Sequence, residues 1–407
     1  MLLLSLRIVG HPMIPGPWLK VGGGLNIFKT IHSEQAQALT RILQTINTPY
    51  NFEETDLFSD LPLYDSRQSY TRKIIPSKKT AAIAIFSASS LLVKELAEID
   101  PAFYKTDRIE VGRRRDRSRW INFIELSSST RWSEIEPIVS NLISCKDPDA
   151  AAAIETLQNS MSILRGADRI KGEVATNLKK QLEALRHYLP EKKHAQLDLC
   201  LHAVDRARHF DQARALINDR LPLFLPVTET EIQRIAHNTD ATLLAEPDSA
   251  PLAFLAERLG KGHMEQTSLA HRLDKINTRL QTDHLEPAIR LSVIGTVLTL
   301  EAIQKSTPLP DADMPPVPRL DTVLSAFAAI HEEIYGHHPI FILDISTMKL
   351  EPLEQDELFA VLLRHSLNSQ CLVIPDRDFF TLCIDRSGNR RADEDIPVSL
   401  IDLTEVC

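Results

Sequence analysis

The chain of 407 residues is long enough to bury one large hydrophobic core or a few smaller ones. Its hydrophobic content of 43% is typical of a folded protein, and its 13 glycines and 6% aromatic residues disfavour an all-β fold with many tight turns. The formal net charge of −9 excludes a globally basic nucleic-acid-binding protein, whereas a local basic patch would still bind phosphates.

The five cysteines show no metal-binding or redox spacing. We therefore expect free thiols in a reducing compartment and a cytoplasmic protein. The apolar segment Leu2–Val9 follows no positively charged stretch and contains Arg7, which favours a strand over a signal peptide. No apolar run has the length of a transmembrane helix, so we expect no membrane association.

The first 145 residues mix strand and helix patterns. The predicted strands are residues 2–9, 18–21, 25–28, 81–86 and 120–126, and the predicted helices are residues 38–46, 91–99 and 132–143. The sequence GGGLNIF (residues 22–28) resembles the approach to a phosphate-binding P-loop, whose motif is GxxxxGK[ST]. The chain instead continues KTIHSEQAQ (residues 29–37) and enters the predicted helix, so the motif is missing.

Residues 149–305 have the apolar spacing of helices almost throughout. Stripes at intervals of three and four occur before and after Pro190, which ends the first of two predicted antiparallel helices. The pattern is compatible either with a short coiled-coil arm or with an ordinary helical domain. Further helices are expected at residues 251–259, 265–280 and 285–303.

Prolines between residues 308 and 318 predict a linker, and α/β character returns after it. The expected order is a helix (residues 320–335), a strand (residues 340–343), a helix (residues 354–367) and a strand (residues 371–374). The first of these strands, in the sequence PIFILDIS, ends in Asp344. A carboxylate at the end of a buried strand is typical of the Mg²⁺ site in P-loop proteins.

The order of these segments resembles the SMC/RecF family of DNA-associated ATPases. LRIV, GGGLNIF and the QALTRILQTI helix match its N-terminal part, the central helices match its insertion, and PIFILD with QCLVI matches its C-terminal part. The resemblance implies an α/β fold, an ABC/SMC-like P-loop ATPase head split by a helical insertion. The corresponding regions are residues 1–145 (N-terminal lobe), 149–305 (insertion), 306–318 (linker) and 319–407 (C-terminal lobe).

Departures from the family pattern concern the groups that hold nucleotide. Alignment on GLNIF puts Gln35 at the position of the P-loop Lys, Ala36 at that of the Ser/Thr and Glu34 at that of the adjacent glycine. Ile345 follows Asp344 where many members have a second carboxylate, and PVPRLD (residues 316–321) lacks the LSGG signature. The predicted degenerate nucleotide site comprises Lys29, His32, Ser33, Gln35, Ala36 and Asp344, and we expect no catalytic residue.

A second candidate site is basic. The sequence DRIEVGRRRDRSRW (residues 107–120) brings together Arg113, Arg114, Arg115, Arg117, Arg119 and Trp120. Guanidinium groups bind phosphates and stack on bases, so these residues are candidate nucleic-acid contacts. A solvated loop or a docking face for an acidic protein would have the same composition. His337 and His338 lack a third residue at metal-ligand spacing, so we expect no metal site.

These patterns favour a catalytically inactive ATPase-like subunit that acts as a scaffold in a DNA-associated complex for repair, chromosome maintenance or phage defence. Its expected partners are an active ATPase subunit or a second copy of itself, paired head to head, and DNA at the arginines. No cofactor is expected. One alternative is a weakly hydrolysing family member that binds ATP and Mg²⁺, and the other is a helical protein-interaction adaptor without nucleotide or DNA function.

Overall fold

The computed structural model describes residues 1–11, 13–14, 16–47, 79–144, 148–228, 269–282, 288–294, 297–303, 315–388 and 397–403. The chain forms two compact units. Unit 1 comprises Met1–Phe86, Val111–Trp120 and Leu221–Cys407, and unit 2 comprises Ser87–Glu110 and Ile121–Arg220. The α/β fold class predicted from the sequence is confirmed by the sheets and helices of unit 1.

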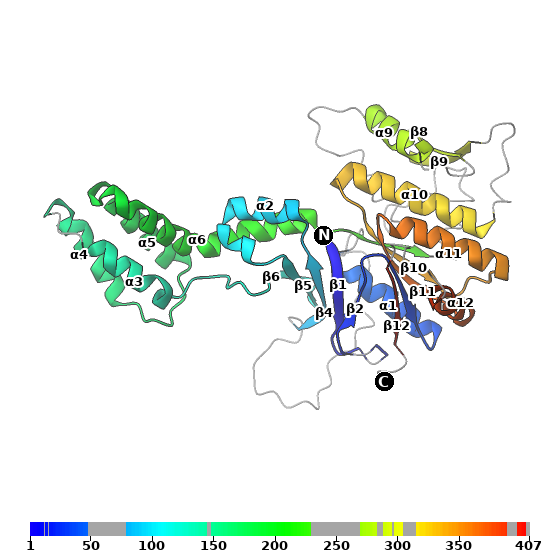
Figure 1. The fold of residues 1–407 in the computed structure, drawn as a ribbon, viewed down its shortest axis with the longest axis horizontal. Helices are drawn as coiled ribbons and strands as arrows, with labels where there is room; N and C mark the ends of the chain where they lie inside the picture. Colours follow the sequence, from blue (N-terminus) through cyan, green and yellow to red (C-terminus); the bar gives the residue numbers. More distant parts are fainter. Residues whose placement is uncertain are drawn as a thin grey trace. The chain divides into compact units, whose positions relative to one another are not determined.

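A five-stranded sheet in the order β12-β3-β11-β10-β7 forms the centre of unit 1 (Figure 1). Each neighbouring pair of strands is parallel. The strands are β3 (Leu25–Lys29), β7 (Phe224–Thr228), β10 (Ile340–Ile345), β11 (Gln370–Pro375) and β12 (Val398–Asp402). Nearly continuous apolar sequences in β10 and β11 account for this placement, because the inner strands of a parallel sheet are buried on both faces.

Helices cover this sheet at positions that the sequence largely predicts. They are α1 (Ser33–Ile46), α9 (Leu269–Thr282), α10 (Pro316–Tyr335), α11 (Pro352–Ser366) and α12 (Arg377–Gly388). Figure 1 shows α11, α10 and α9 as successive layers, and their apolar side chains join those of the strands in one core. Helix α10 ends at Gly336, whose φ of 71° is the left-handed conformation of a helix C-cap.

A second sheet has the order β2-β1-β4-β5-β6. Its strands are β1 (Leu2–Ile8), β2 (Leu19–Lys20), β4 (Thr80–Ser87), β5 (Arg108–Arg114) and β6 (Arg119–Phe123). The buried side chain of Gln370, at the start of β11, joins this sheet to the parallel one. Its Oε1 accepts a hydrogen bond from Leu3 N at 2.7 Å, and its Nε2 donates to Leu3 O at 2.8 Å.

The expectation that residues 149–305 are almost wholly helical is wrong at residues 224–228, 288–294 and 297–303, which form strands, whereas α9 confirms the helix expected at residues 265–280 within its described part. Strand β7 belongs to the parallel sheet, and the helix expected at residues 285–303 is an antiparallel hairpin of β8 (Ala288–Ile294) and β9 (Val297–Ile303). Polar and apolar residues alternate in AIRLSVI and VLTLEAI, which is the period of a strand. The helix expected at residues 251–259 and residues 306–314 of the linker lie outside the described residues, and residues 316–318 belong to α10.

Helices α3 to α6 form a separate small core in unit 2. They are α3 (Trp132–Ile143), α4 (Ala151–Ser162), α5 (Gly172–Leu185) and α6 (Glu191–Arg220). The leucine stripe of α5 is buried as predicted, and α6 follows Pro190 directly. Because apolar side chains of all four helices meet in one cluster, the packing is that of a helical domain and not of a two-stranded coiled coil.

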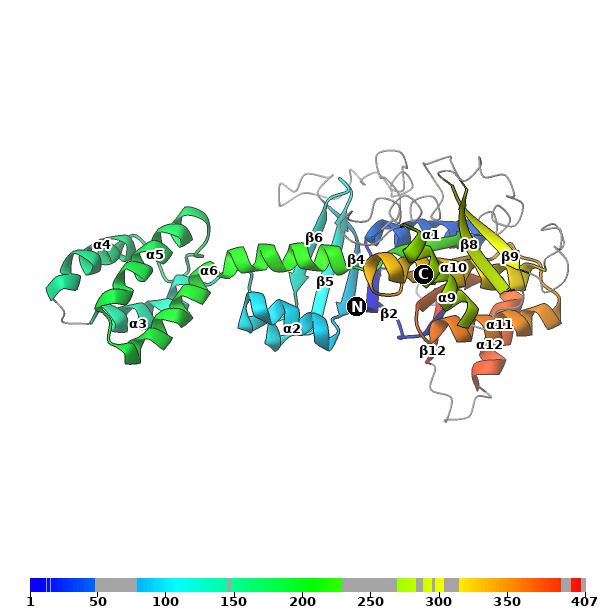
Figure 2. The same ribbon diagram turned by 90° about the horizontal axis from the view of Figure 1, so that it is seen from above.

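Helix α6 extends beyond this core to α2 (Ser90–Ile99), as Figure 2 shows. There Phe210 of α6 packs against Phe103 and Phe123, with ring centroids 5.3 and 5.2 Å away. At the preceding residue, the buried His209, Nδ1 lies 3.1 Å from Asp100 Oδ2. Among the described helices, none combines the length and apolar character that crossing a membrane requires.

Candidate functional site

The carboxyl ends of the parallel strands meet at one edge of the sheet, which is where ligands bind in open α/β folds. Lys29 and Asp402 occupy paired positions at the ends of β3 and β12, and Asp344 lies near the end of β10. Strand β11 lies between β3 and β10. The strand order thus brings the predicted nucleotide-site residues Lys29 and Asp344 to the same edge of the sheet.

The connection from β3 to α1 consists of Thr30, Ile31 and His32. Helix α1 begins at Ser33 and not at Ala38, so the segment expected to replace a P-loop is largely the first turn of the helix. This connection has no room for the GxxxxGK[ST] loop, whose backbone amides surround the phosphates. His32 is the N-cap residue without a capping side-chain bond, and both His32 and Ser33 are exposed.

Lys29 is engaged within the protein. Its Nζ lies 2.6 Å from Asp402 Oδ2 and 5.7 Å from the ring centroid of Phe380, over the aromatic face. The carboxylate neutralises the ammonium group, and the aromatic ring covers one side of it. Lys29 is therefore held at the sheet edge by α12 and β12 and does not extend from a loop as a P-loop lysine does.

Gln35 and Ala36, the residues aligned with the P-loop Lys and Ser/Thr, are buried in the first turn of α1. The Gln35 amide braces the local chain, because its Oε1 accepts a hydrogen bond from Ile31 N and its Nε2 donates to Met13 O, both at 2.7 Å. Neither residue presents a cation or a hydroxyl. The exposed Glu34 beside them adds a negative charge that would repel a polyphosphate.

Asp344 retains the position of a strand-end carboxylate but binds neighbouring hydroxyl groups. Its Oδ1 accepts hydrogen bonds from Ser346 Oγ at 2.6 Å and Ser346 N at 3.2 Å, and Oδ2 lies 3.5 Å from Thr40 Oγ1. The following residue, Ile345, has an apolar side chain that is 2% exposed, so a second carboxylate is missing at this position. Together with the short β3–α1 connection, these residues do not fit ATP and Mg²⁺ in the manner of a P-loop site.

The arginine-rich segment forms the hairpin of β5 and β6, and two of its arginines bind the C-terminal end of α1. Arg113, which is 5% exposed, donates from Nε to Thr45 O at 2.6 Å and from Nη1 to Arg117 O at 2.6 Å. Arg119 Nη2 donates to Ile46 O at 3.1 Å and to Asn47 Oδ1 at 2.6 Å. These cations satisfy carbonyl groups and oppose the negative end of the helix dipole.

Burial lowers the pKa of Arg113 to about 9, with a further contribution from the charge of Arg119. Burial likewise lowers the pKa of Arg119 to about 10. Both side chains remain charged at neutral pH. The prediction that Arg113 is a nucleic-acid contact is corrected by these bonds, because its guanidinium group is enclosed by its own chain.

Trp120 and the remaining arginines differ from Arg113 and Arg119 in their contacts. The indole of Trp120 packs across Gly112, where a Cβ atom would lie 1.9 Å from the ring, and its Nε1 donates to Thr80 Oγ1 at 3.2 Å. Arg114, Arg115 and Arg117 lie in the turn region and are partly exposed, with Arg114 Nη1 donating to Ser118 Oγ at 3.2 Å. These three arginines remain the accessible part of the predicted basic site.

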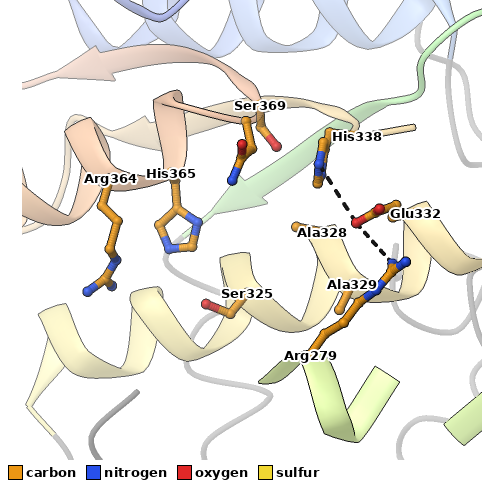
Figure 3. A pocket seen from close by; sticks show the side chains of 10 residues that line it. Arg279, Ser325, Ala328, Ala329, Glu332, His338, Arg364, His365 and Ser369 are labelled. Atoms are coloured by element: carbon orange, nitrogen blue, oxygen red, sulfur yellow. Dashed lines mark ion pairs between the residues drawn. The ribbon is translucent and has the colours of Figure 1, made fainter. Parts of the chain in front are cut away.

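A cavity of about 310 Å³ lies elsewhere in unit 1, between α9, α10 and α11. Figure 3 shows Glu332 between Arg279 and His338, at distances of 2.9 and 3.7 Å. Nearer the start of α10, Asp321 contacts His365 at 2.7 Å and also pairs with Arg364. These bonds outweigh the effect of burial and lower the pKa of Asp321. Each carboxylate is thus matched to an arginine and a histidine, which joins neighbouring helices.

The turn before β10 has the histidines that the sequence suggested as weak metal ligands. The fully buried His331 is hydrogen-bonded through its Nδ1 to His337 O at 2.6 Å. Burial lowers the pKa of His331 to about 3. Within the described ranges, no group of three or more His, Cys, Asp or Glu side chains is arranged to hold a metal ion. Of these histidines, His331 is a buried core residue, whereas His337 and His338 are partly exposed.

Sequence reasoning missed Asp402, Thr40 and helix α12. Asp402 lies 373 positions from Lys29, and nothing local to either residue indicates their pairing. Helix α12 had a readable signal, because Asp376 precedes it and accepts a hydrogen bond from Phe379 N at 2.8 Å, as an N-cap residue does. The apolar residues Phe379, Phe380 and Cys383 then recur at helical spacing.

The chain resembles SMC head domains and RecF in fold. It is 10% identical to an SMC head bound to the C-terminal winged-helix domain of ScpA, over 93% of this chain and 91% of that chain, with a TM-score of 0.45. For an Smc head domain with a coiled coil and joint from Pyrococcus yayanosii, the identity is 14%, the coverage 94% and 93%, and the TM-score 0.40.

For the recombination mediator protein RecF with ATP, the identity is 12%, the coverage 98% and 97%, and the TM-score 0.30. No model of a known protein family and no curated protein matches the chain. Similarities at this level concern the fold alone and do not show what the chain binds or catalyses.

Proposed function

We propose that this protein is an ATPase-like subunit that does not hydrolyse ATP and serves as a scaffold in a DNA-associated complex. The observation that carries the proposal is the direct passage from β3 into α1 through Thr30–His32, with Lys29 bound to Asp402 at 2.6 Å. The sheet edge at which a P-loop protein holds nucleotide is present, while the phosphate-holding loop is replaced by a helix turn.

The charges at this edge support the absence of hydrolysis. Phosphoryl transfer depends on cations that stabilise charge on the transferred group. Here the one cation at the end of β3 is neutralised by Asp402, and Gln35 holds the backbone of Ile31 and Met13. The negative charge of Glu34, in the first turn of α1, would repel a triphosphate.

Purified full-length protein should release no phosphate from ATP above the background of an Asp344→Ala variant. Binding of a fluorescent ATP analogue with Mg²⁺ should likewise be absent. ATP hydrolysis abolished by Asp344→Ala would disprove the proposal. Tight ATP binding that is lost in Asp344→Asn, without turnover, would favour the alternative of a nucleotide-binding subunit, because Asp344 keeps the strand-end position of a Mg²⁺ ligand.

A protein partner, either an active ATPase subunit or a second copy of this chain, is part of the proposal. Ile31 supports a contact at the sheet edge, because this apolar side chain is 50% exposed between β3 and α1. Ile31→Glu should weaken assembly, measured by light scattering with size-exclusion chromatography or by co-purification of the native partner. An unchanged assembly would place the partner elsewhere.

DNA contact is proposed for the exposed part of the β5–β6 hairpin. Arg115→Glu with Arg117→Glu should weaken binding of duplex DNA and reduce its salt dependence. Arg113 is left intact in this test because its side chain binds the backbone of α1. An unchanged gel shift would remove DNA binding at this hairpin from the proposal.

A further inference from the structure

Unit 2 contains a cavity of about 460 Å³ that the proposed function does not use. Its walls come from the segment before α3, the start of α5 and the middle of α6. The charged side chains that line it are Arg169, Lys171, Asp205, Arg208, Asp211 and Arg214. Four cations and two carboxylates therefore face one hollow, in a protein whose overall net charge is negative.

The two carboxylates already have cationic partners. Asp211 pairs with Arg214 at 2.9 Å, and Asp205 pairs with Arg208 at 2.9 Å and with Lys179 at 2.6 Å. Within the part of the chain that the structure describes, the ion pairs of these carboxylates thus involve Lys179, Arg208 and Arg214. The positive charges of Arg169 and Lys171 are therefore additional to the cations that pair with the two carboxylates.

Residues with hydroxyl groups line the same cavity as these two cations. Ser128 and Ser129 belong to the same lining, and so does Thr176, whose hydroxyl group already donates to Gly172 O at 3.2 Å. Lys171 is the N-cap residue of α5, and Gly172 is its first residue, so the positive end of the helix dipole adds to the charge of the wall. Cations and neutral donors converging on one hollow are suited to a compact group with several negatively charged oxygens.

We propose that this cavity binds the phosphate monoester or pyrophosphate group of a small ligand. Two cations in excess match a group with two or more negative charges. A nucleic-acid backbone carries its phosphates in a row and is matched by a row of cations. The cations here are gathered around a single cavity, which favours a small phosphorylated ligand over nucleic acid.

The test uses the full-length protein and inorganic pyrophosphate, with binding measured by calorimetry and thermal shift at low ionic strength. Wild type should bind pyrophosphate, and Arg169→Gln with Lys171→Ser should lower the affinity about tenfold or more. Serine is a better N-cap residue than lysine, so this variant should not melt at a lower temperature for lack of the lysine. Lys180→Gln removes an exposed cation of the same helix outside the cavity and should bind as wild type does.

Failure of wild type to bind pyrophosphate, or equal binding by the double variant, would overturn the proposal. A loss of equal size in Lys180→Gln would also overturn it, since the effect would then be nonspecific. A single-stranded oligonucleotide that binds through Arg169 and Lys171, with no response to pyrophosphate, would assign the cavity to nucleic acid instead. The outcome is independent of ATP hydrolysis, because Asp344 belongs to unit 1.

Discussion

Lys29 Nζ and Asp402 Oδ2 form an ion pair of 2.6 Å between register-paired positions of β3 and β12. The pair joins the strand that would precede a P-loop to the edge strand of the parallel sheet. It therefore stabilises the sheet at the place where a nucleotide-binding protein would keep its cation available.

The Lys29–Asp402 pair should contribute modestly to stability, because both side chains are partly exposed. A double-mutant cycle of Lys29→Met and Asp402→Asn should show a coupling energy of about 1 kcal/mol or less, decreasing with salt. Urea unfolding at low and high ionic strength measures it. Lys20→Met, at an exposed lysine of β2, is the control, and a coupling that grows with salt would contradict the assignment.

Arg113→Ala should lower the free energy of unfolding by about 2–3 kcal/mol, because it leaves the buried Thr45 carbonyl without its charged donor. Arg113→Lys should recover part of the loss, since an ammonium group cannot make both guanidinium bonds. Chemical denaturation provides the measurement. Arg114→Ala, at a partly exposed position of the same hairpin, should cost about 0.5 kcal/mol or less.

The stability of the protein should fall in acid through His331. Burial lowers its folded-state pKa from 6.5 to about 3, so the unfolded chain binds a proton that the folded chain excludes. The contribution of His331 to the free energy of unfolding is fully present above pH 6.5. It is lost as the pH falls toward 3, at about 1.4 kcal/mol per pH unit.

Denaturation at pH 7 and pH 5 should reveal this loss as a difference between wild type and His331→Asn. The asparagine amide can still donate to His337 O but does not titrate. The variant should therefore lose less stability on acidification than wild type does. Equal pH dependence of the two proteins would show that His331 is not the titrating group.

Gln370→Ala should destabilise unit 1 by about 2–4 kcal/mol, since it removes bonds to Leu3 N and O and a third, of 2.8 Å, to Gly22 O. Differential scanning calorimetry would register a lower melting temperature. Gln37→Ala, at an exposed position of α1, should have little effect. Similar melting of the two variants would mean that the buried amide adds nothing to the junction of the sheets.

Local patterns in the sequence did not reveal β7 and β12 of the parallel sheet. They did locate β10 and β11, because both strands are mostly apolar and have polar residues near their ends. They also located the strand before the missing P-loop. They placed the start of α1 at Ala38 because HSEQAQ is polar, whereas Gln35 and Ala36 are buried by tertiary contacts. Polarity alone could not show that an amide side chain would find backbone partners in the core.

The sequence could not show that the five arginines have different environments, and the reason is a different one. Five arginines in a short stretch look alike in sequence, but strand alternation and the turn separate Arg113 and Arg119, which bind α1, from those in the turn. The distinction depends on α1, which is far away in the chain. The excess charge of Arg169 and Lys171 was hidden in the same way, because their neighbours in the cavity come from α6.

Helix α6 has 30 residues and therefore extends over about 45 Å. Its first half carries Leu197, Cys200 and Val204 in the four-helix core, and its second half carries Phe210 in the aromatic cluster. A continuous helix behaves as a stiff rod. A displacement or rotation of the four-helix core would thus be transmitted through α6 to the aromatic cluster. The two clusters could move independently only if backbone hydrogen bonds within α6 were broken.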